Sequence, residues 1–273
     1  MHSQKRLWLI GGTQESAALA QSIADAGFAC VISVTTESAR SLYPISPHLS
    51  IRVGYLTPES LPPFIQAHQI GAILDASHPF AAEISQLAIA VAQEYQLPYL
   101  RYERPEVGEM EKIREMGQEE SGASTIVYLD GFESLLAGNY LVGQRVLLTL
   151  GYRSLPLFQP WQERATLFAR ILPSVTALQA ALQAGFTSDR LIAIRPPISA
   201  ELEQALWQQW QITTVVTKAS GVAGGEDIKR QIAAKLNICL IVMGRPQVAY
   251  PQQTSDLLVA LEFCRQYCIS QSG

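Results

Sequence analysis

The sequence is 273 residues long, which is enough for one large or two modest domains. Hydrophobic residues make up 48% of it and charged residues 16%, a balance that excludes an intrinsically disordered chain. The formal net charge of −4 offers no general basic field to nucleic acid or to an anionic membrane. No apolar run approaches the ~18 residues that a membrane span requires, so we expect a soluble globular protein without nucleic-acid or membrane partners.

The cysteines indicate the compartment. They lack the spacing of a zinc site, and no signal peptide is recognisable at the N-terminus. We therefore expect reduced, buried thiols in a cytoplasmic protein that holds no metal. The four are Cys30, Cys239, Cys264 and Cys268.

The first half of the chain alternates between short apolar strands and helices, which predicts parallel strands joined by crossover helices. Strands are expected at residues 6–10, 29–34, 51–53, 70–76 and 98–102. Helices are expected at residues 15–26, 58–68 and 81–95. Between residues 107 and 124 the composition turns polar and rich in Gly and Glu, without periodicity, which predicts a loop with a domain boundary nearby.

The alternation resumes after this loop and predicts a second α/β domain. Its strands are expected near residues 125–128, 145–150, 166–171, 191–194, 213–216 and 238–243, and its helices near residues 176–184, 200–210 and 227–236. A last helix at residues 254–267 could cover either domain. We therefore divide the chain into a dinucleotide-binding domain of residues 1–124 and a second domain of residues 125–273.

The first candidate site is the turn after the first strand. The strand runs into Gly11 and Gly12, whose missing side chains let a phosphate approach the backbone N–H groups at a helix N-terminus. Thr13 can add a hydroxyl. The G-x-G-x-x-G fingerprint is incomplete because Glu15 and Ser16 occupy the later positions, and a tight turn without a ligand is the alternative.

The end of the second strand bears on the choice between NAD and NADP. An acidic residue there binds the ribose 2′-hydroxyl, whereas a 2′-phosphate requires hydroxyls or Arg. Thr35, Thr36, Ser38 and Arg40 favour NADP, and Glu37 favours NAD. A solvated loop that happens to carry these residues is the alternative.

Polar side chains also follow two later strands of the first half. Asp75 and His78 come just after a strand, so His78 is placed to donate a proton or contact a ligand, with Asp75 orienting it or the loop. Arg101 and Arg104 lie at the end of the next strand and could hold carboxylates, although Glu103 could neutralise one of them. A structural histidine and a solvated charge cluster are the alternatives.

The second half repeats the order of strand, Gly-rich turn and helix. Lys218, Ser220 and Gly221 lie in this turn, which is a possible anion site with an ammonium beside it. The contiguous Gly-Lys-Ser/Thr of a Walker A loop is missing, which argues against an NTPase. Three further arginines follow predicted strands in this half: Arg153, Arg195 and Arg245.

Taken together, these motifs resemble the precorrin-6A reductase family of corrin-ring biosynthesis. The resemblance rests on GGT-x-E at 11–15, DASHPFA at 75–81, R-x-E-R-P at 101–105, LLTLGYRSL at 147–155, RPPIS at 195–199, TKASG at 217–221 and GRP at 244–246. The family usually has Thr where Ser77 stands, an acidic residue where Ala219 stands, and Gly where Pro196 stands. Ser77 keeps the hydroxyl, whereas Ala219 puts in doubt a carboxylate beside Lys218.

The resemblance implies hydride transfer from NADPH to a carbon–carbon double-bond system of precorrin-6A, or its cobalt form, to give precorrin-6B. It implies an α/β fold of two Rossmann-like parallel-sheet domains that face a central cleft, and it allows an exchange of strands between them. The cofactor residues are then Gly11, Gly12, Thr13, Glu15, Thr36, Ser38 and Arg40. The substrate residues are Asp75, Ser77, Arg101, Arg104, Arg153, Lys218, Ser220, Gly221 and Arg245. His78 would deliver the proton or orient the macrocycle.

Two rival functions stay open. A reductase of a smaller substrate would ordinarily carry a Tyr-x-x-x-Lys pair, which the sequence lacks at any plausible position. A non-catalytic dinucleotide sensor would use the same glycine turn, but it leaves the second basic Gly-rich turn without a role. The residues do not indicate whether the substrate carries cobalt, and a monomer is compatible with them.

Overall fold

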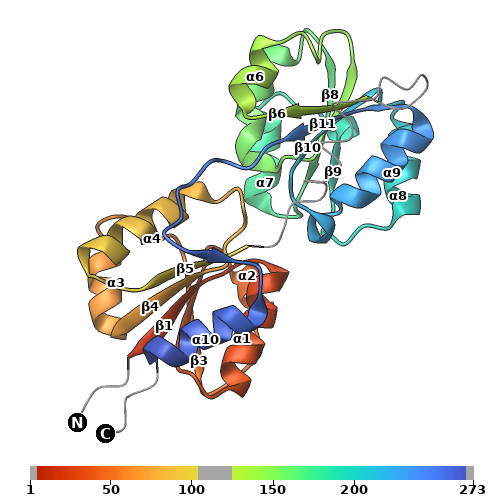
Figure 1. The fold of residues 1–273 in the computed structure, drawn as a ribbon. Coiled ribbons are helices and arrows are strands. Elements are labelled where there is room, and N and C mark those ends of the chain that lie inside the picture. Colours follow the sequence, from red (N-terminus) through yellow and green to blue (C-terminus); the bar gives the residue numbers. More distant parts are fainter. Residues whose placement is uncertain (1–4, 104–124, 269–273) are drawn as a thin grey trace, which may run out of the picture. The chain divides into compact units, whose positions relative to one another are not determined.

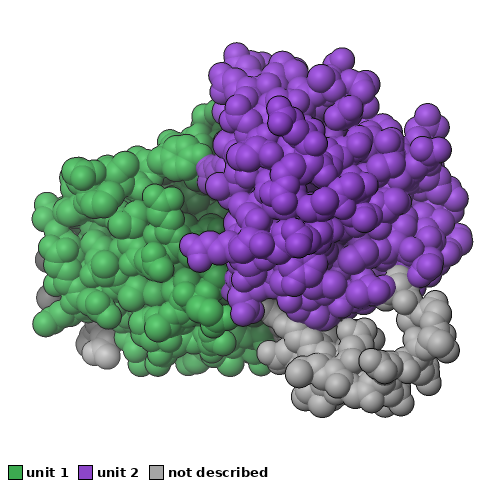
Figure 2. All heavy atoms as spheres, turned by 90° about the horizontal axis from the view of Figure 1, so that it is seen from above, with its two compact units in different colours: residues 1–105, 246–273 green, residues 106–245 purple. Residues whose placement is uncertain are grey.

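The chain forms two compact α/β units. The computed structural model describes residues 5–103 and 125–268. One unit comprises residues 1–105 and 246–273, and the other comprises residues 106–245 (Figure 2). The division made from the sequence assigned everything after residue 124 to the second domain, whereas in the structure the segment after Arg245 returns to the first unit. None of the helices in the described part of the chain has the length and apolar character of a membrane span.

The first unit contains one six-stranded sheet in which every strand pair is parallel. Its elements are β1 (Arg6–Ile10), α1 (Gln14–Asp25), β2 (Cys30–Val34), α2 (Glu37–Arg40), β3 (Leu49–Val53), α3 (Leu61–His68), β4 (Ile70–Asp75), α4 (Ala82–Glu94), β5 (Tyr99–Tyr102), β12 (Gln253–Thr254) and α10 (Leu257–Cys268) (Figure 1). The strand order is β12-β5-β4-β1-β2-β3. This is the 3-2-1-4-5-6 order of the Rossmann fold, with β12 in the sixth place.

Helices cover both faces of this sheet, which is why its central strands are continuous apolar runs. Leu7 and Leu9 of β1 pack on the face that α1 and α10 cover, whereas Trp8 and Ile10 pack on the face of α3 and α4. The final helix contributes Ala260, Phe263, Cys264 and Cys268 to the first of these cores. It therefore belongs to the first unit.

The second unit repeats this topology. Its elements are β6 (Ile126–Leu129), α6 (Phe132–Ala137), β7 (Arg145–Leu148), η1 (Tyr152–Trp161), β8 (Thr166–Ile171), α7 (Val175–Gln183), η2 (Ser188–Arg190), β9 (Leu191–Ala193), α8 (Ala200–Gln209), β10 (Thr214–Lys218), η3 (Val222–Gly224), α9 (Glu226–Leu236) and β11 (Cys239–Met243). The strand order β6-β11-β10-β7-β8-β9 is again parallel throughout. The expected fold class of two Rossmann-like parallel-sheet domains is confirmed; that they face a common cleft stays a prediction.

The two sheets exchange their sixth strands. β6 follows β5 along the chain, yet it pairs with β11 in the second sheet. β12 follows β11 along the chain, yet it pairs with β5 in the first sheet, with Gln253 opposite Arg101. The sixth strand of the second sheet therefore follows the fifth strand of the first sheet along the chain, and the sixth strand of the first sheet follows the fifth strand of the second.

The predicted strands and helices are all present, with ends that differ by at most three residues. The predictions missed α2, α6, η1, η2, η3 and β12, all of which are short or irregular. α2 has only four residues, β12 has two, and Pro156 and Pro160 lie inside the 3₁₀ turns of η1. Such elements carry too few residues for a periodic pattern.

Candidate functional site

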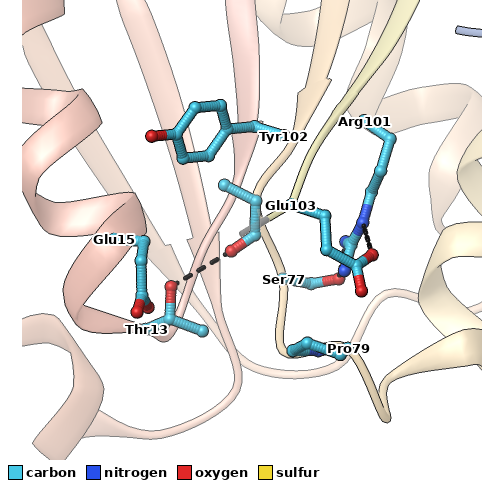
Figure 3. A pocket seen from close by; sticks show the side chains of 8 residues that line it. Thr13, Glu15, Ser77, Pro79, Arg101, Tyr102 and Glu103 are labelled. Atoms are coloured by element: carbon cyan, nitrogen blue, oxygen red, sulfur yellow. Dashed lines mark hydrogen bonds and ion pairs between the residues drawn. The ribbon is translucent and has the colours of Figure 1, made fainter. Parts of the chain in front are cut away.

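The glycine turn after β1 and the loop after β4 meet at the switch point of the first sheet, where the crossovers from neighbouring strands leave in opposite directions. β1 and β4 are neighbours at this switch point, and ligands of open α/β sheets bind outside the carboxyl ends of such strands. Thr13 follows β1, and its hydroxyl donates to the Ala76 carbonyl after β4 over 3.2 Å (Figure 3). The glycine turn and the Asp75–Pro79 loop therefore form one crevice.

A pocket opens at this crevice. Figure 3 shows it between the start of α1, which carries Thr13 and Glu15, and the ends of β4 and β5. It therefore brings predicted cofactor residues together with two predicted substrate residues, Ser77 and Arg101. The lining residues are Thr13, Glu15, Ala76, Ser77, Pro79, Arg101, Tyr102 and Glu103.

The start of α1 is closed by a reciprocal cap. The Thr13 hydroxyl accepts the N–H of Ser16 at 3.0 Å, and the Ser16 hydroxyl accepts the N–H of Thr13 at 3.0 Å. The cap thus satisfies the N–H of Ser16 in the first turn and the N–H of Thr13 before it. The positive end of the helix is therefore directed at the crevice.

Gly11 and Gly12 are each favoured over a larger residue, but for different structural reasons. A Cβ on Gly11 would overlap the hydroxyl oxygen of Tyr43, so the turn has no room for a side chain there. Gly12 has open space around it but adopts a φ of +108°, which favours glycine. Its N–H donates to the Tyr43 hydroxyl at 2.6 Å. Sequence reasoning missed Tyr43, and no motif around it signals a contact with a turn 31 positions away.

The predicted 2′-phosphate residues gather on α2, at the carboxyl end of β2. Thr36 caps this short helix, and its hydroxyl lies 3.1 Å from that of Ser38. The Arg40 guanidinium lies 3.8 Å from the Glu37 carboxylate, and both side chains are exposed. Such an exposed pair is weak, so Arg40 can turn to a bound phosphate at little cost.

Asp75 is a buried carboxylate with four hydrogen-bond donors around it. Its carboxylate accepts hydrogen bonds from the Ser85 hydroxyl at 2.6 Å, the Tyr99 hydroxyl at 2.7 Å, the Arg101 guanidinium at 2.8 Å and the Ser77 N–H at 3.0 Å. The side chain is fully buried. Burial, and then the neighbouring Asp75 charge, raise the pKa of Tyr99. The geometry shows Asp75 holding the loop after β4, which is the second of the two roles expected for it.

Arg101 is also fully buried, and it joins three segments. It donates to Asp75, to the Ser77 hydroxyl at 3.0 Å and to the Glu103 carboxylate at 2.8 Å, and it lies over the Tyr250 ring with its Cζ 5.2 Å from the centroid. Burial opposes its charge, but Asp75 and Glu103 outweigh this effect and raise the pKa of Arg101. The expected neutralisation by Glu103 is thus present. Arg104 lies outside the described residues.

His78 is exposed beside the pocket residues Ser77 and Pro79. Its Nδ1 accepts the N–H of Phe80 at 3.2 Å, so the neutral ring carries its proton on Nε2. The ring can therefore donate a hydrogen bond from Nε2. Its orientation comes from the backbone of Phe80, whereas the Asp75 carboxylate already serves four other donors.

In the second unit, basic residues follow neighbouring strands at one sheet edge. Lys218 ends β10 and Arg153 follows β7, and these two strands flank the switch point of the second sheet. Burial, and then the charge of Arg153, lower the pKa of Lys218, so the two cations lie within electrostatic range. Arg245 follows β11 and donates to the Ala219 carbonyl at 3.0 Å.

The Gly-rich turn of this unit is occupied by its own side chains. The N–H of Gly221 donates to the Glu226 carboxylate at 2.9 Å, where an anion would otherwise lie. The Lys229 ammonium donates to the Gly224 and Gly225 carbonyls, each at 3.0 Å. Ser220 is buried beside this turn. The basic side chains that the structure brings to this edge are those of Arg153, Lys218 and Arg245, and their binding of an anion stays a prediction.

These features define a class: an α/β protein of two Rossmann-type sheets, with a glycine turn at the switch point of the first. The model of the family described as "Precorrin-6x reductase CbiJ/CobK" matches residues 6–265, and the chain belongs to this family.

Individual relatives extend over the same length. The chain is 47% identical to the cobalt-precorrin-6A reductase of Synechocystis sp. over 264 residues, which cover 96% of each chain. It is 32% identical to the cobalt-precorrin-6A reductase of Priestia megaterium, over 89% of this chain and 91% of the relative. A solved structure described as "CobK precorrin-6A reductase" is similar in fold, with a TM-score of 0.76 at 22% identity over 98% of this chain and all of the other.

Proposed function

We propose that this protein reduces precorrin-6A or its cobalt form, with NADPH bound at the switch point of the first unit. Family membership supports the reduction of this tetrapyrrole in cobalamin biosynthesis. The single observation that supports the cofactor site is the meeting of the glycine turn with the loop after β4 in one crevice.

The residues of the first unit fit a dinucleotide. The glycine turn and the first turn of α1 would hold the pyrophosphate at the positive end of this helix. Glu15 lies at the edge of the same pocket. Thr36, Ser38 and Arg40 would hold the 2′-phosphate, because two hydroxyls and an exposed guanidinium share one short helix. When bound, NADPH supplies the hydride, and the chain supplies position and charge.

The substrate is proposed to bind through its carboxylates. Arg153, Lys218 and Arg245 place positive groups at the carboxyl edge of the second sheet, where acetate and propionate groups would compensate the charges that lie close together. In the first unit, Ser77 offers a hydroxyl at the pocket wall, and Asp75 and Arg101 hold it in place. Contacts of the substrate with Ser220, Gly221 and Arg104 stay predictions.

His78 is proposed to orient the macrocycle or to deliver the proton. Its side chain is exposed beside the pocket, and the neutral ring, held by the Phe80 N–H, offers its Nε2–H for a hydrogen bond to the macrocycle. Proton delivery requires the imidazolium, whose Nδ1–H no longer accepts from Phe80. Replacing His78 with Ala should slow turnover and leave the NADPH Kd unchanged, because the residue does not belong to the glycine turn or to α2. Unchanged single-turnover reduction would assign the proton to solvent instead.

The test is a direct assay with purified protein. NADPH and precorrin-6A, and in parallel cobalt-precorrin-6A, are added, and oxidation is followed at the nicotinamide absorbance band. Loss of this band together with formation of the reduced macrocycle supports the proposal. Binding of NADPH without its oxidation in either mixture would favour the sensor, and oxidation of NADH at the same rate as that of NADPH would contradict the assignment of α2.

A further inference from the structure

Tyr43 links the glycine turn to the chain segment after α2. The residue is almost fully buried, and its backbone N–H donates to the Arg40 carbonyl at 3.2 Å. Its hydroxyl accepts the N–H of Gly12 at 2.6 Å and lies 2.6 Å from the Ser16 hydroxyl. One side chain from beyond the second strand therefore contacts both the turn after the first strand and the helix that follows it.

The hydrogens of this cluster can be assigned. The Ser16 hydroxyl donates to the Thr13 carbonyl at 2.7 Å and accepts the Thr13 N–H at 3.0 Å. Because a serine hydroxyl has one hydrogen, the Tyr43 hydroxyl is the donor in its bond with Ser16. A continuous chain runs from the Gly12 N–H through Tyr43 and Ser16 to the Thr13 carbonyl, and each hydroxyl in it both donates and accepts. Burial raises the pKa of Tyr43, so the donor keeps its proton at neutral pH.

The same hydroxyl explains the shape of the turn. The overlap that a Cβ on Gly11 would make is with Tyr43, and its ring carbon Cζ would be only 3.0 Å away. The positive φ of Gly12 occurs where its N–H is directed at Tyr43. The conformation of both glycines is therefore adapted to an internal hydroxyl, which occupies the inner side of the turn before any ligand arrives.

We propose that Tyr43 is a positioning residue of the cofactor site: its hydroxyl holds the glycine turn and the start of α1 in the arrangement that receives the pyrophosphate. It acts through Gly12 and Ser16 and does not touch the cofactor. This inference rests on the proposed function, because the ligand of the turn is the proposed dinucleotide. Preorganising the turn in this way removes part of the ordering entropy that binding would otherwise require.

The test is Tyr43→Phe, which removes the hydroxyl and keeps the ring. We expect the Kd values of NADPH and NADH to rise by the same factor, on the order of fivefold for one lost hydrogen bond, since both nucleotides carry the pyrophosphate. Binding is measured by nicotinamide fluorescence, at a temperature where circular dichroism shows every variant folded. Tyr140→Phe, at a half-exposed tyrosine of the second unit, is the matched control and should leave both Kd values unchanged.

A double-mutant cycle makes the inference specific. Ser16→Ala removes the other end of the chain and also the hydroxyl that accepts the Thr13 N–H, without touching the tyrosine ring. It should therefore weaken binding at least as much as Tyr43→Phe, and the double variant should be no weaker than Ser16→Ala alone. If Tyr43→Phe does not fold, Ser16→Ala decides alone. Wild-type affinity in these variants would overturn the role of Tyr43 and leave the proposed function standing. A wild-type protein that binds no NADPH would overturn both.

Discussion

The guanidinium of Arg101 lies 2.8 Å from the carboxylate of Asp75, and both side chains are completely buried. The pair joins the end of β5 to the end of β4 at the wall of the pocket, and hydrogen bonds from Ser77, Ser85 and Tyr99 surround it. A buried ion pair of this kind contributes little relative to an apolar substitute, but removing the Asp75 charge weakens the acceptor of four donors and leaves Arg101 with the Glu103 carboxylate alone. The crevice therefore depends on the pair being intact.

Asp75→Asn should accordingly destabilise the protein strongly. The amide keeps the shape but removes the charge that faces Arg101, and we expect a loss of about 3 kcal/mol in the free energy of unfolding. Urea unfolding followed by circular dichroism measures it. Arg265→Ala is the control, because Arg265 and Glu262 form an exposed pair whose loss should change stability by less than about 1 kcal/mol. Equal effects of the two substitutions would contradict a structural role for the buried pair.

The two glycines of the first turn should respond differently to alanine. Gly11→Ala creates an overlap with the Tyr43 hydroxyl, so Tyr43→Phe in the same chain should restore part of the lost stability. Gly12→Ala meets open space and is strained only by its φ of +108°, by about 1 kcal/mol or more, which Tyr43→Phe cannot relieve. Thermal unfolding of the four variants compares them. Rescue of Gly12→Ala, or none for Gly11→Ala, would show that the reasons assigned to the two positions are wrong.

The sequence was sufficient to predict features that depend on local pattern. The apolar run of β1 was recognisable because both faces of a central parallel strand are buried, and the turn after it because Gly11 and Gly12 precede a helix. The contacts that give the crevice its form depend on long-range pairing. Tyr43 reaches Gly12 across 31 positions, and β12 pairs with β5 although about 150 residues separate them in the chain.

The candidate site shows the same limit. The sequence pattern placed Asp75 and Arg101 at the ends of two strands of the first half, yet it could not show that the two side chains would form an ion pair in the pocket wall. It also predicted an anion-binding turn at Gly221 without showing that the Glu226 carboxylate accepts the N–H group. Such details follow from side-chain packing, which the pattern of residues along the chain does not determine.

Lys229 should make stability depend on pH. Its ammonium is buried under the Gly-rich turn, and burial lowers its pKa from 10.5 to about 8. Below pH 8 the folded and unfolded states are both protonated, and the folded state carries the full penalty of the buried charge. Between about pH 8 and 10.5 the unfolded chain binds the extra proton, so the contribution of Lys229 to stability rises with pH, by up to about 3 kcal/mol.

The measurement compares the wild type with Lys229→Met by urea unfolding across that range. The difference in unfolding free energy should shift in favour of the wild type as the pH rises, because the neutral amine keeps its hydrogen bonds to Gly224 and Gly225. Lys235→Met, at an exposed position of the same helix, controls for the loss of a lysine. A difference that stays constant from pH 7 to 10.5 would contradict a buried ammonium.

The basic side chains at the carboxyl edge of the second sheet should affect the binding of the tetrapyrrole and leave the binding of NADPH unchanged. Lys218→Met and Arg153→Ala each remove one of two cations that lie within electrostatic range of each other, and the substrate carboxylates are proposed to bind to them. We expect the KM for precorrin-6A to rise about tenfold in each variant, as for the loss of one charge-assisted hydrogen bond, with the NADPH Kd unchanged. Arg190→Ala, at a surface arginine of the same unit, is the matched control. A raised NADPH Kd together with an unchanged KM would assign this edge to the cofactor instead of the tetrapyrrole.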